Sequence, residues 1–175
     1  MRGEIALGDV YAQRLDAVLP SREEILELGR AYMDRIEKGA EESLAKLTNA
    51  GIRLVLVTAG IRDAILPVAR AVGLPASAVN AVSLYFTESG EYAGFDLQTP
   101  LTRNGGKVMV VRGLGLEGPV LGVGDGITDL ELRTADPPAV DAFAAYTGVV
   151  ERPPVVRGAD YVISGFDQLP GIVLG

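Results

Sequence analysis

The feature that most constrains the fold is a repeated succession of an apolar strand, a short turn and a helix. Residues 53–57 (RLVLV) form an apolar run typical of a buried strand. After a TAG turn, apolar residues recur near helical spacing until the chain reaches Gly73 and Pro75. A second apolar strand within residues 118–126 (GPVLGVGDG) also runs into a turn. Strands that alternate with helices predict an α/β fold with a doubly wound parallel sheet.

Shorter elements are expected around this sheet. A helix over residues 6–19 is followed by a second helix that begins at Ser21, because Glu24 three positions later completes a capping-box pattern. A third helix is expected between Gly39 and Gly51. The remaining expectations are a hairpin of residues 79–86 and 91–95, a short helix at 107–114, strands at 142–146 and 161–163, and an extended segment at 151–156.

The size of the chain limits the number of domains. With 175 residues and a hydrophobic content of 48%, the chain suits one compact core and at most a small appendage. The two N-terminal helices are the candidate for that appendage, a small helical lid.

The inventory of charged and reactive residues excludes several functions. A net charge of -7 and a pI near 4.6 argue against binding to nucleic acid or to an anionic membrane, which needs clustered Lys and Arg. The chain contains no Cys and no His, which removes thiol and imidazole catalysis and the corresponding metal ligands. We therefore expect a small-molecule partner, and any metal should be a hard, oxygen-bound ion such as Mg²⁺.

Hydropathy along the chain bears on its location. No apolar run near the N-terminus has the length of a signal peptide. No stretch approaches the ~20 apolar residues that a membrane-spanning helix needs. A cytoplasmic location without a membrane partner is the default expectation.

The string GDGITDLE carries the most specific chemical signal. It sets Asp125 at the carboxyl end of a predicted strand, the edge where open α/β sheets bind ligands, and Asp129 in the first turn of the next helix. Gly124 and Gly126 permit close approach by an ion or a phosphate. The alternative is an ordinary strand-to-helix turn, in which Asp129 favours the helix dipole.

Thr58 directly follows the strand at 53–57. Its hydroxyl and the amides of Ala59 and Gly60 are candidates to receive phosphate oxygens at a helix N-terminus. The alternative is a threonine that only caps the helix.

Lys107 and Arg14 are the candidate cationic residues. Lys107 follows two glycines in a chain with three lysines and thirteen arginines, and its compact ammonium suits phosphate. Arg14 on the first helix has the fork geometry that clamps a carboxylate. Taken alone, each is also explained as a solvated surface residue.

In this order, the hydroxyl-ended strand, the GGK loop and the GDGxTD turn resemble the second, third and fourth motifs of haloacid dehalogenase-like phosphatases. Four longer strings resemble the phosphoserine phosphatase branch, and the resemblance covers nearly the whole chain. These strings are GEYAGFD (90–96), TRNGGK (102–107), ADPPAVDAF (135–143) and GVVERPPVVRGADYVI (148–163).

The resemblance implies a Mg²⁺-dependent phosphomonoester hydrolase of serine biosynthesis. Phosphate would be bound by Thr58, Ala59, Gly60, Lys107 and Thr128, with Lys107 as the catalytic cation. Asp125 would hold Mg²⁺ with Asp129 in support. Arg14 would meet the carboxylate of phosphoserine, and residues 1–38 would belong to the helical cap, with 39–175 as the Rossmann-like core.

Two departures from the family pattern stand out. The TAG at 58–60 replaces a more usual serine followed by two glycines, and the first motif, Asp-x-Asp, occurs nowhere in the 175 residues. In the family, its first Asp attacks phosphorus and its second is the general acid and base. We therefore expect a chain that begins inside the cap, is inactive by itself and binds Mg²⁺ weakly or not at all.

The missing first strand is central in the family's sheet. Its absence would expose two apolar strand edges, which a homo-oligomer would cover. Two other functions remain open, a non-catalytic phosphate-binding or regulatory module and a phosphatase for another small phosphorylated metabolite.

Overall fold

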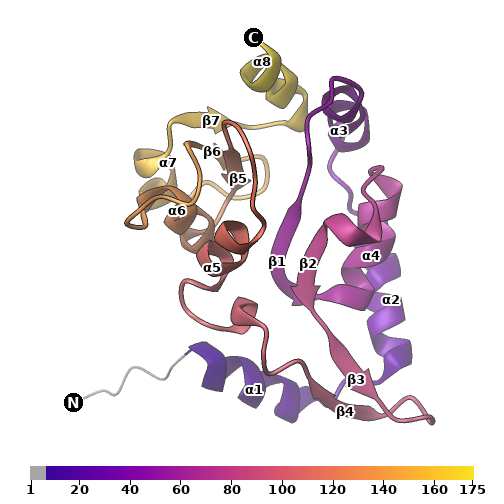
Figure 1. The fold of residues 1–175 in the computed structure, drawn as a ribbon. Helices are drawn as coiled ribbons and strands as arrows, with labels where there is room; N and C mark the ends of the chain where they lie inside the picture. Colours follow the sequence, from indigo (N-terminus) through magenta and orange to yellow (C-terminus); the bar gives the residue numbers. More distant parts are fainter. Residues whose placement is uncertain (1–6) are drawn as a thin grey trace. The chain divides into compact units, whose positions relative to one another are not determined.

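A computed structural model describes residues 7–175, which form two compact units. The first unit contains the described residues up to Arg35 together with Val55–Gly106, and the second contains Ile36–Leu54 and Lys107–Gly175. The chain therefore crosses between the units three times. This division differs from the predicted division after residue 38, because residues 55–106 group with the N-terminal helices (Figure 1).

The first unit combines helices with two small sheets. In chain order its elements are α1 (Leu7–Val18), α2 (Arg22–Met33), β1 (Leu56–Ile61), α4 (Arg62–Ala71), η1 (Ala76–Ala78), β2 (Val79–Val82), β3 (Leu84–Phe86), β4 (Tyr92–Phe95) and η2 (Pro100–Thr102). β1 pairs with β2 in parallel, and β3 pairs with β4 in antiparallel fashion.

The predicted capping box of α2 is confirmed. The Ser21 hydroxyl accepts the Glu24 N–H at 3.2 Å, and the Glu24 carboxylate accepts the Ser21 N–H at 2.7 Å. Further along, α2 packs against α4 at Gly29, where a Cβ would lie 3.3 Å from the carbonyl oxygen of the fully buried Ala64. Small residues at the crossing let the two helices approach closely.

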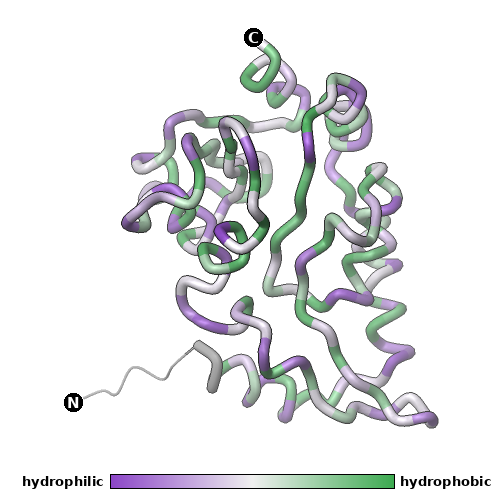
Figure 2. The backbone as a smooth tube through the Cα atoms, in the orientation of Figure 1, coloured by the Kyte–Doolittle hydropathy of each residue, from purple (hydrophilic) through white to green (hydrophobic). Residues whose placement is uncertain are grey.

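The strands of the first unit differ from their predicted bounds. The ladder begins at Leu56 and continues through Ile61, whereas a strand at 53–57 was expected. The hydrophobic run that enters β1 is visible in Figure 2. The expected hairpin strand 79–86 is divided at Ser83, because its first half pairs with β1 and its second half pairs with β4.

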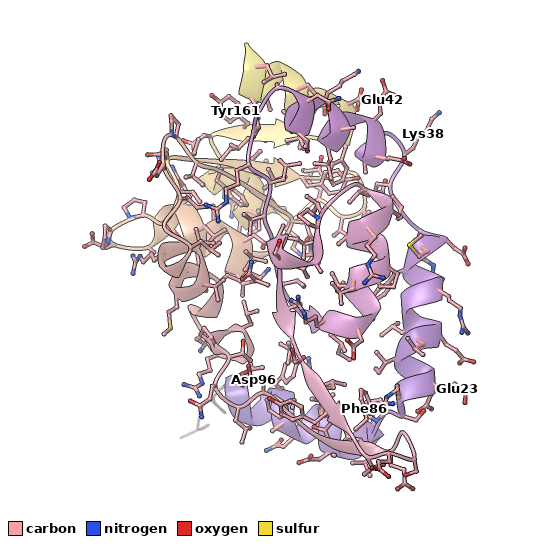
Figure 3. All side chains as sticks on the ribbon, turned by 45° about the vertical axis from the view of Figure 1, so that its right-hand side comes forward. Glu23, Lys38, Glu42, Phe86, Asp96 and Tyr161 are labelled. Atoms are coloured by element: carbon pink, nitrogen blue, oxygen red, sulfur yellow. The ribbon has the colours of Figure 1, made fainter. Side chains whose placement is uncertain are left out.

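An apolar cluster packs the helices of the first unit against its hairpin. Its buried members come from α1, α2, α4 and β3, and aromatic residues of the hairpin pack around them. They are Leu15, Ile25, Ala64 and Leu84. At the edge of the cluster, the Arg22 guanidinium lies 5.5 Å from the centre of the Phe86 ring, which Figure 3 labels.

The second unit is built around a three-stranded parallel sheet in the order β5-β6-β7. Its elements are α3 (Ala40–Asn49), α5 (Gly106–Gly113), β5 (Leu121–Gly124), α6 (Ile127–Thr134), β6 (Ala142–Tyr146), α7 (Pro153–Gly158), β7 (Tyr161–Ile163), η3 (Phe166–Gln168) and α8 (Leu169–Leu174). The strands predicted at 142–146 and 161–163 are confirmed.

Helices cover both faces of this sheet. Ala144 packs with Leu47 of α3 and Leu169 of α8, whereas its neighbours Phe143 and Ala145 pack with α6 and α7. Successive strand residues point to opposite faces, so the two clusters lie on opposite sides of β6. This arrangement confirms the predicted α/β class with parallel strands and helices on both faces.

In the C-terminal part, one expectation was wrong and one helix had not been expected. Residues 151–156 were expected to be extended, but Pro153–Gly158 form α7, because prolines in the first helical turn carry no N–H that needs a partner. The helix α8 was not predicted. Among residues 7–175, no helix is both long and apolar enough to cross a membrane.

Candidate functional site

The predicted site residues are divided between the two units. Arg14, Thr58, Ala59 and Gly60 belong to the first unit, and Lys107, Asp125, Thr128 and Asp129 belong to the second. We call residues 58–60 the phosphate loop, and Lys107, Asp125, Asp129 and Arg152 the charged corner.

The phosphate loop is a bulge in β1. Val57 is opposite Asn80 and Ile61 is opposite Val82, so three loop residues stand against Ala81 alone. The extra residues leave the regular ladder and bend the strand locally. The backbone conformation of the loop is therefore set by hydrogen bonds outside the regular strand pairing.

Two hydrogen bonds fix the peptide group between Ala59 and Gly60. The Gly60 N–H donates to the Thr58 hydroxyl oxygen at 2.9 Å. The Ala59 carbonyl oxygen accepts from the Tyr11 hydroxyl at 3.0 Å. Because Thr58 Oγ1 serves here as an acceptor, its own hydrogen is left to donate to an anion.

From the sequence, residues 58–60 were expected to lie at a helix N-terminus. In the structure, no helix begins at the phosphate loop. α4 starts at Arg62 and its N-cap is Ile61, which makes no side-chain capping bond. Thr58 is therefore not a helix cap. The Gly60 amide donates to Thr58, so it is already engaged within the loop, while the hydrogen of the Thr58 hydroxyl is left as a donor.

Tyr11 is a site residue that the sequence reasoning missed. Its ring lies 5.5 Å from that of Phe95, at an interplanar angle of 57°. Burial, and secondarily the nearby Tyr92, raises the pKa of Tyr11 to about 12. The phenol therefore stays protonated and able to donate at ordinary pH. Arg14, three residues later on α1, is exposed.

In the charged corner, Lys107 and Asp129 form a salt bridge with 2.6 Å between Nζ and Oδ1. The two side chains are only 17% and 15% exposed. The other oxygen of Asp129 accepts the Gly126 N–H at 3.0 Å, which caps α6. Gly124 makes room for this carboxylate, because a Cβ there would lie 2.3 Å from Asp129 Cγ.

Asp125 is paired with Arg152, the residue immediately before α7. The Arg152 guanidinium donates to the Asp125 carboxylate and, at 3.1 Å, to its backbone carbonyl. The pair is about half-exposed. Arg152 lies inside the string at 148–163 that resembles the phosphatases, but nothing in the sequence indicated its partner. Thr128 lies exposed in the first turn of α6.

The corner offers oxygen donors of the kind that Mg²⁺ prefers, but too few of them. Within residues 7–175, no group of three or more His, Cys, Asp or Glu side chains is arranged to hold a metal ion. Both corner carboxylates are already neutralised by a cationic side chain. These residues alone therefore do not fit a complete Mg²⁺ site.

Comparison of the sequence with known proteins identifies relatives of this chain. Residues 9–133 match the profile of the family described as haloacid dehalogenase-like hydrolase. The chain is 36% identical over 172 residues to the chloroplastic phosphoserine phosphatase of Arabidopsis thaliana, and this match covers 97% of the chain and 58% of that protein. It is 34% identical over 174 residues to the phosphoserine phosphatase of Mus musculus, where it covers 98% of the chain and 76% of that protein.

Solved structures agree on the fold. A phosphoserine phosphohydrolase-like protein from Francisella tularensis superimposes with a TM-score of 0.82 at 24% identity, over 99% of this chain and 80% of that one. A cytosolic 5'-nucleotidase IIIB has a TM-score of 0.60 at 19% identity, over 89% of this chain and 56% of that one. At these identities, the likeness extends to the fold alone.

Proposed function

We propose that this chain, which belongs to the haloacid dehalogenase-like hydrolase family and to the phosphoserine phosphatases within it, supplies the phosphate-binding and substrate-binding part of a Mg²⁺-dependent phosphoserine phosphatase and is inactive without the Asp-x-Asp motif. The observation that carries this proposal is the 36% identity to a phosphoserine phosphatase over 97% of the chain. The contacts of the phosphate loop and the placement of Lys107 by Asp129 are consistent with it.

The chain's own residues have definable tasks in this reaction. The Thr58 hydroxyl donates to a phosphate oxygen, because its oxygen already accepts the Gly60 N–H. The Lys107 ammonium neutralises charge on the phosphoryl group, and Asp129 holds that ammonium in place. Arg14, exposed on α1, takes the carboxylate of phosphoserine.

The nucleophile is proposed to come from outside these 175 residues, which contain no Asp-x-Asp sequence. The first Asp of that motif bonds to phosphorus while the bond from phosphorus to the serine oxygen breaks, and the second Asp protonates that oxygen. Water then hydrolyses the phospho-aspartate. Within the described residues, β1 and β5 each pair on one edge only, so each has an edge that an added strand would pair with.

Mg²⁺ belongs to the same proposal. Asp125 is the carboxylate of the chain that would contribute a ligand, with further oxygen donors supplied together with the nucleophile. When bound, the ion would neutralise phosphoryl charge.

The decisive experiment compares the 175-residue chain with a product extended by the in-frame upstream codons. Phosphate release from phosphoserine is measured with and without Mg²⁺. We expect turnover by the extended product only, and loss of turnover when the first Asp of its Asp-x-Asp is changed to Asn. Equal turnover by the short chain would show that the nucleophile lies within the 175 residues.

Substrate choice is tested separately through Arg14. Arg14→Ala should weaken phosphoserine hydrolysis by the extended product at least tenfold in kcat/KM, because a paired carboxylate loses its charge-assisted bonds. The exposed Arg30→Ala on α2 is the matched control. An unchanged value for Arg14→Ala would point to another small phosphorylated metabolite.

A non-catalytic phosphate-binding module is the second candidate. The observation that favours it is that both carboxylates of the corner are already paired with cationic side chains. Binding of phosphoserine without hydrolysis by both the short and the extended products would support this candidate over the first.

A further inference from the structure

We propose that Tyr11 is a positioning residue that sets the shape of the phosphate loop and ties helix α1, with Arg14, to that loop. The functional meaning of this inference rests on the proposed function. Its structural basis is the hydrogen bond from Tyr11 to the Ala59 carbonyl within the first unit.

One peptide plane connects Tyr11 with Thr58. The Ala59 carbonyl and the Gly60 N–H belong to the same planar peptide group. Tyr11 holds the oxygen end of this plane and Thr58 holds the nitrogen end. A plane held at both ends cannot rotate without breaking a hydrogen bond, so the direction of the Thr58 hydroxyl depends on Tyr11.

The phenol is itself held firmly. Tyr11 packs at the edge of the apolar cluster that contains Leu15 and Leu84, and its ring is tilted against Phe95 of β4. α1 lies beside the β3–β4 hairpin in the first unit (Figure 1). The high pKa of Tyr11 keeps the hydroxyl a donor throughout the physiological range.

The same contact fixes the position of Arg14. Residues three apart on a helix are neighbours, with about 5–6 Å between their Cβ atoms. Tyr11 and Arg14 therefore move together, and the bond to Ala59 sets how far the guanidinium can stand from the phosphate loop. A fixed short span favours small substrates that carry a phosphate and a second anionic group close together.

The first test measures amide exchange at Gly60 by NMR in the 175-residue chain. Tyr11→Phe removes only the hydroxyl and keeps the ring in the cluster. We expect Gly60 exchange to rise roughly three- to tenfold, the loss expected for one neutral hydrogen bond. Thr58→Val, which removes the other anchor of the plane, should accelerate exchange of the same amide.

Tyr92→Phe is the matched control. Tyr92 belongs to the same cluster and is likewise a tyrosine with a raised pKa, caused mainly by burial. If Tyr11→Phe leaves Gly60 exchange unchanged, or if Tyr92→Phe raises it equally, the inference is overturned. A rise specific to Tyr11→Phe supports it.

The second test concerns ligand selection in the extended product. Tyr11→Phe should raise KM for phosphoserine severalfold while inhibition by inorganic phosphate changes less, because only phosphoserine uses both Arg14 and the loop. Equal weakening of both ligands would contradict the tie between α1 and the loop. If the unaltered protein binds neither ligand, the proposed function fails, whereas the exchange result still decides the role of Tyr11 in the loop.

Discussion

The phosphate loop and the charged corner are held in place by different forces. In the loop, neutral groups of Tyr11 and Thr58 hold one peptide plane. In the corner, two salt bridges pair Lys107 with Asp129 and Arg152 with Asp125. Neutral hydrogen bonds depend little on salt or on pH near neutrality, whereas ion pairs weaken as salt rises, the half-exposed Arg152–Asp125 pair more than the mostly buried Lys107–Asp129 pair.

As a result, the phosphate loop contributes a defined backbone shape to the candidate site, and the charged corner contributes its charged groups. The loop geometry is set by hydrogen bonds within the first unit, so no ligand is needed to form it. The corner holds its two cationic side chains against carboxylates, so an arriving phosphate or metal ion must compete with an internal partner. Binding at the corner is therefore an exchange of partners, which costs part of the energy gained.

The largest expected effect comes from adding one methyl group in each region. Gly124→Ala should destabilise the protein by about 3 kcal/mol, because its Cβ would overlap Asp129. Gly60→Ala should change stability by less than about 1 kcal/mol, since the nearest atom, Thr58 Oγ1, is 3.2 Å away. Urea unfolding measures both. Equal losses of stability would show that the two regions do not differ in the room they leave for a side chain.

Removal of one cation should have the next largest effect. Lys107→Met leaves the mostly buried Asp129 carboxylate without its partner, and we expect a loss of about 2 kcal/mol by chemical denaturation. Lys46→Met is the control, because Lys46 pairs with Glu42 (labelled in Figure 3) in an exposed bridge, and its removal should change stability much less. The double variant Lys107→Met with Asp129→Asn should recover part of the loss.

Acid should weaken the second unit through Asp160. This carboxylate accepts from Arg133 at 2.9 Å and from the Phe143 N–H at 2.8 Å, and these bonds lower its pKa. A lowered folded pKa contributes stability that is present above the unfolded value of about 3.9 and is lost as pH falls through the folded value.

Asp160→Asn should therefore lower the urea midpoint at pH 7 and lose this difference in strong acid. The exposed Asp34→Asn, just after α2, removes one carboxylate at the surface and serves as the control for the change of charge. A difference between the unaltered protein and Asp160→Asn that stays constant from neutral pH to strong acid would contradict the prediction.

The smallest expected effect is that of Mg²⁺ on the 175-residue chain. With both corner carboxylates paired, 10 mM MgCl₂ should stabilise the chain by less than about 0.4 kcal/mol over NaCl of equal ionic strength. Arg152→Gln frees Asp125 and should give Mg²⁺-dependent NMR shifts at Gly126. A large stabilisation of the unaltered chain by Mg²⁺ would show that the corner is a better metal site than its pairing indicates.

Much of the fold could be predicted because its signals are local. The capping box at Ser21 and Glu24 needs only four residues, and the apolar run 142–146 forms a strand in its predicted place. The break at Ser83 could not be predicted, because it depends on which strand pairs with each half of residues 79–86. The helix α7 was missed because two prolines suggest extended chain as readily as a helix start.

The same limit applies to the site. Motifs identified Thr58, Lys107, Asp125 and Asp129 as chemically important. They did not indicate that Lys107 pairs with Asp129, and they gave no sign of Tyr11. Contacts between residues far apart in sequence follow from packing, which no short string records. The roles of the site residues toward ligands stay predictions.

The interleaving of the two units has a consequence for biosynthesis. α3 is made before most of the first unit, yet Leu47 packs against Ile163 and Leu169 near the C-terminus. As the chain leaves the ribosome, the first unit has all of its residues once Gly106 has emerged, while α3 still exposes its apolar face. A chain stalled after Gly106 would thus carry all residues of the first unit together with α3, a helix of the second unit whose apolar face is still uncovered and open to chaperones and proteases.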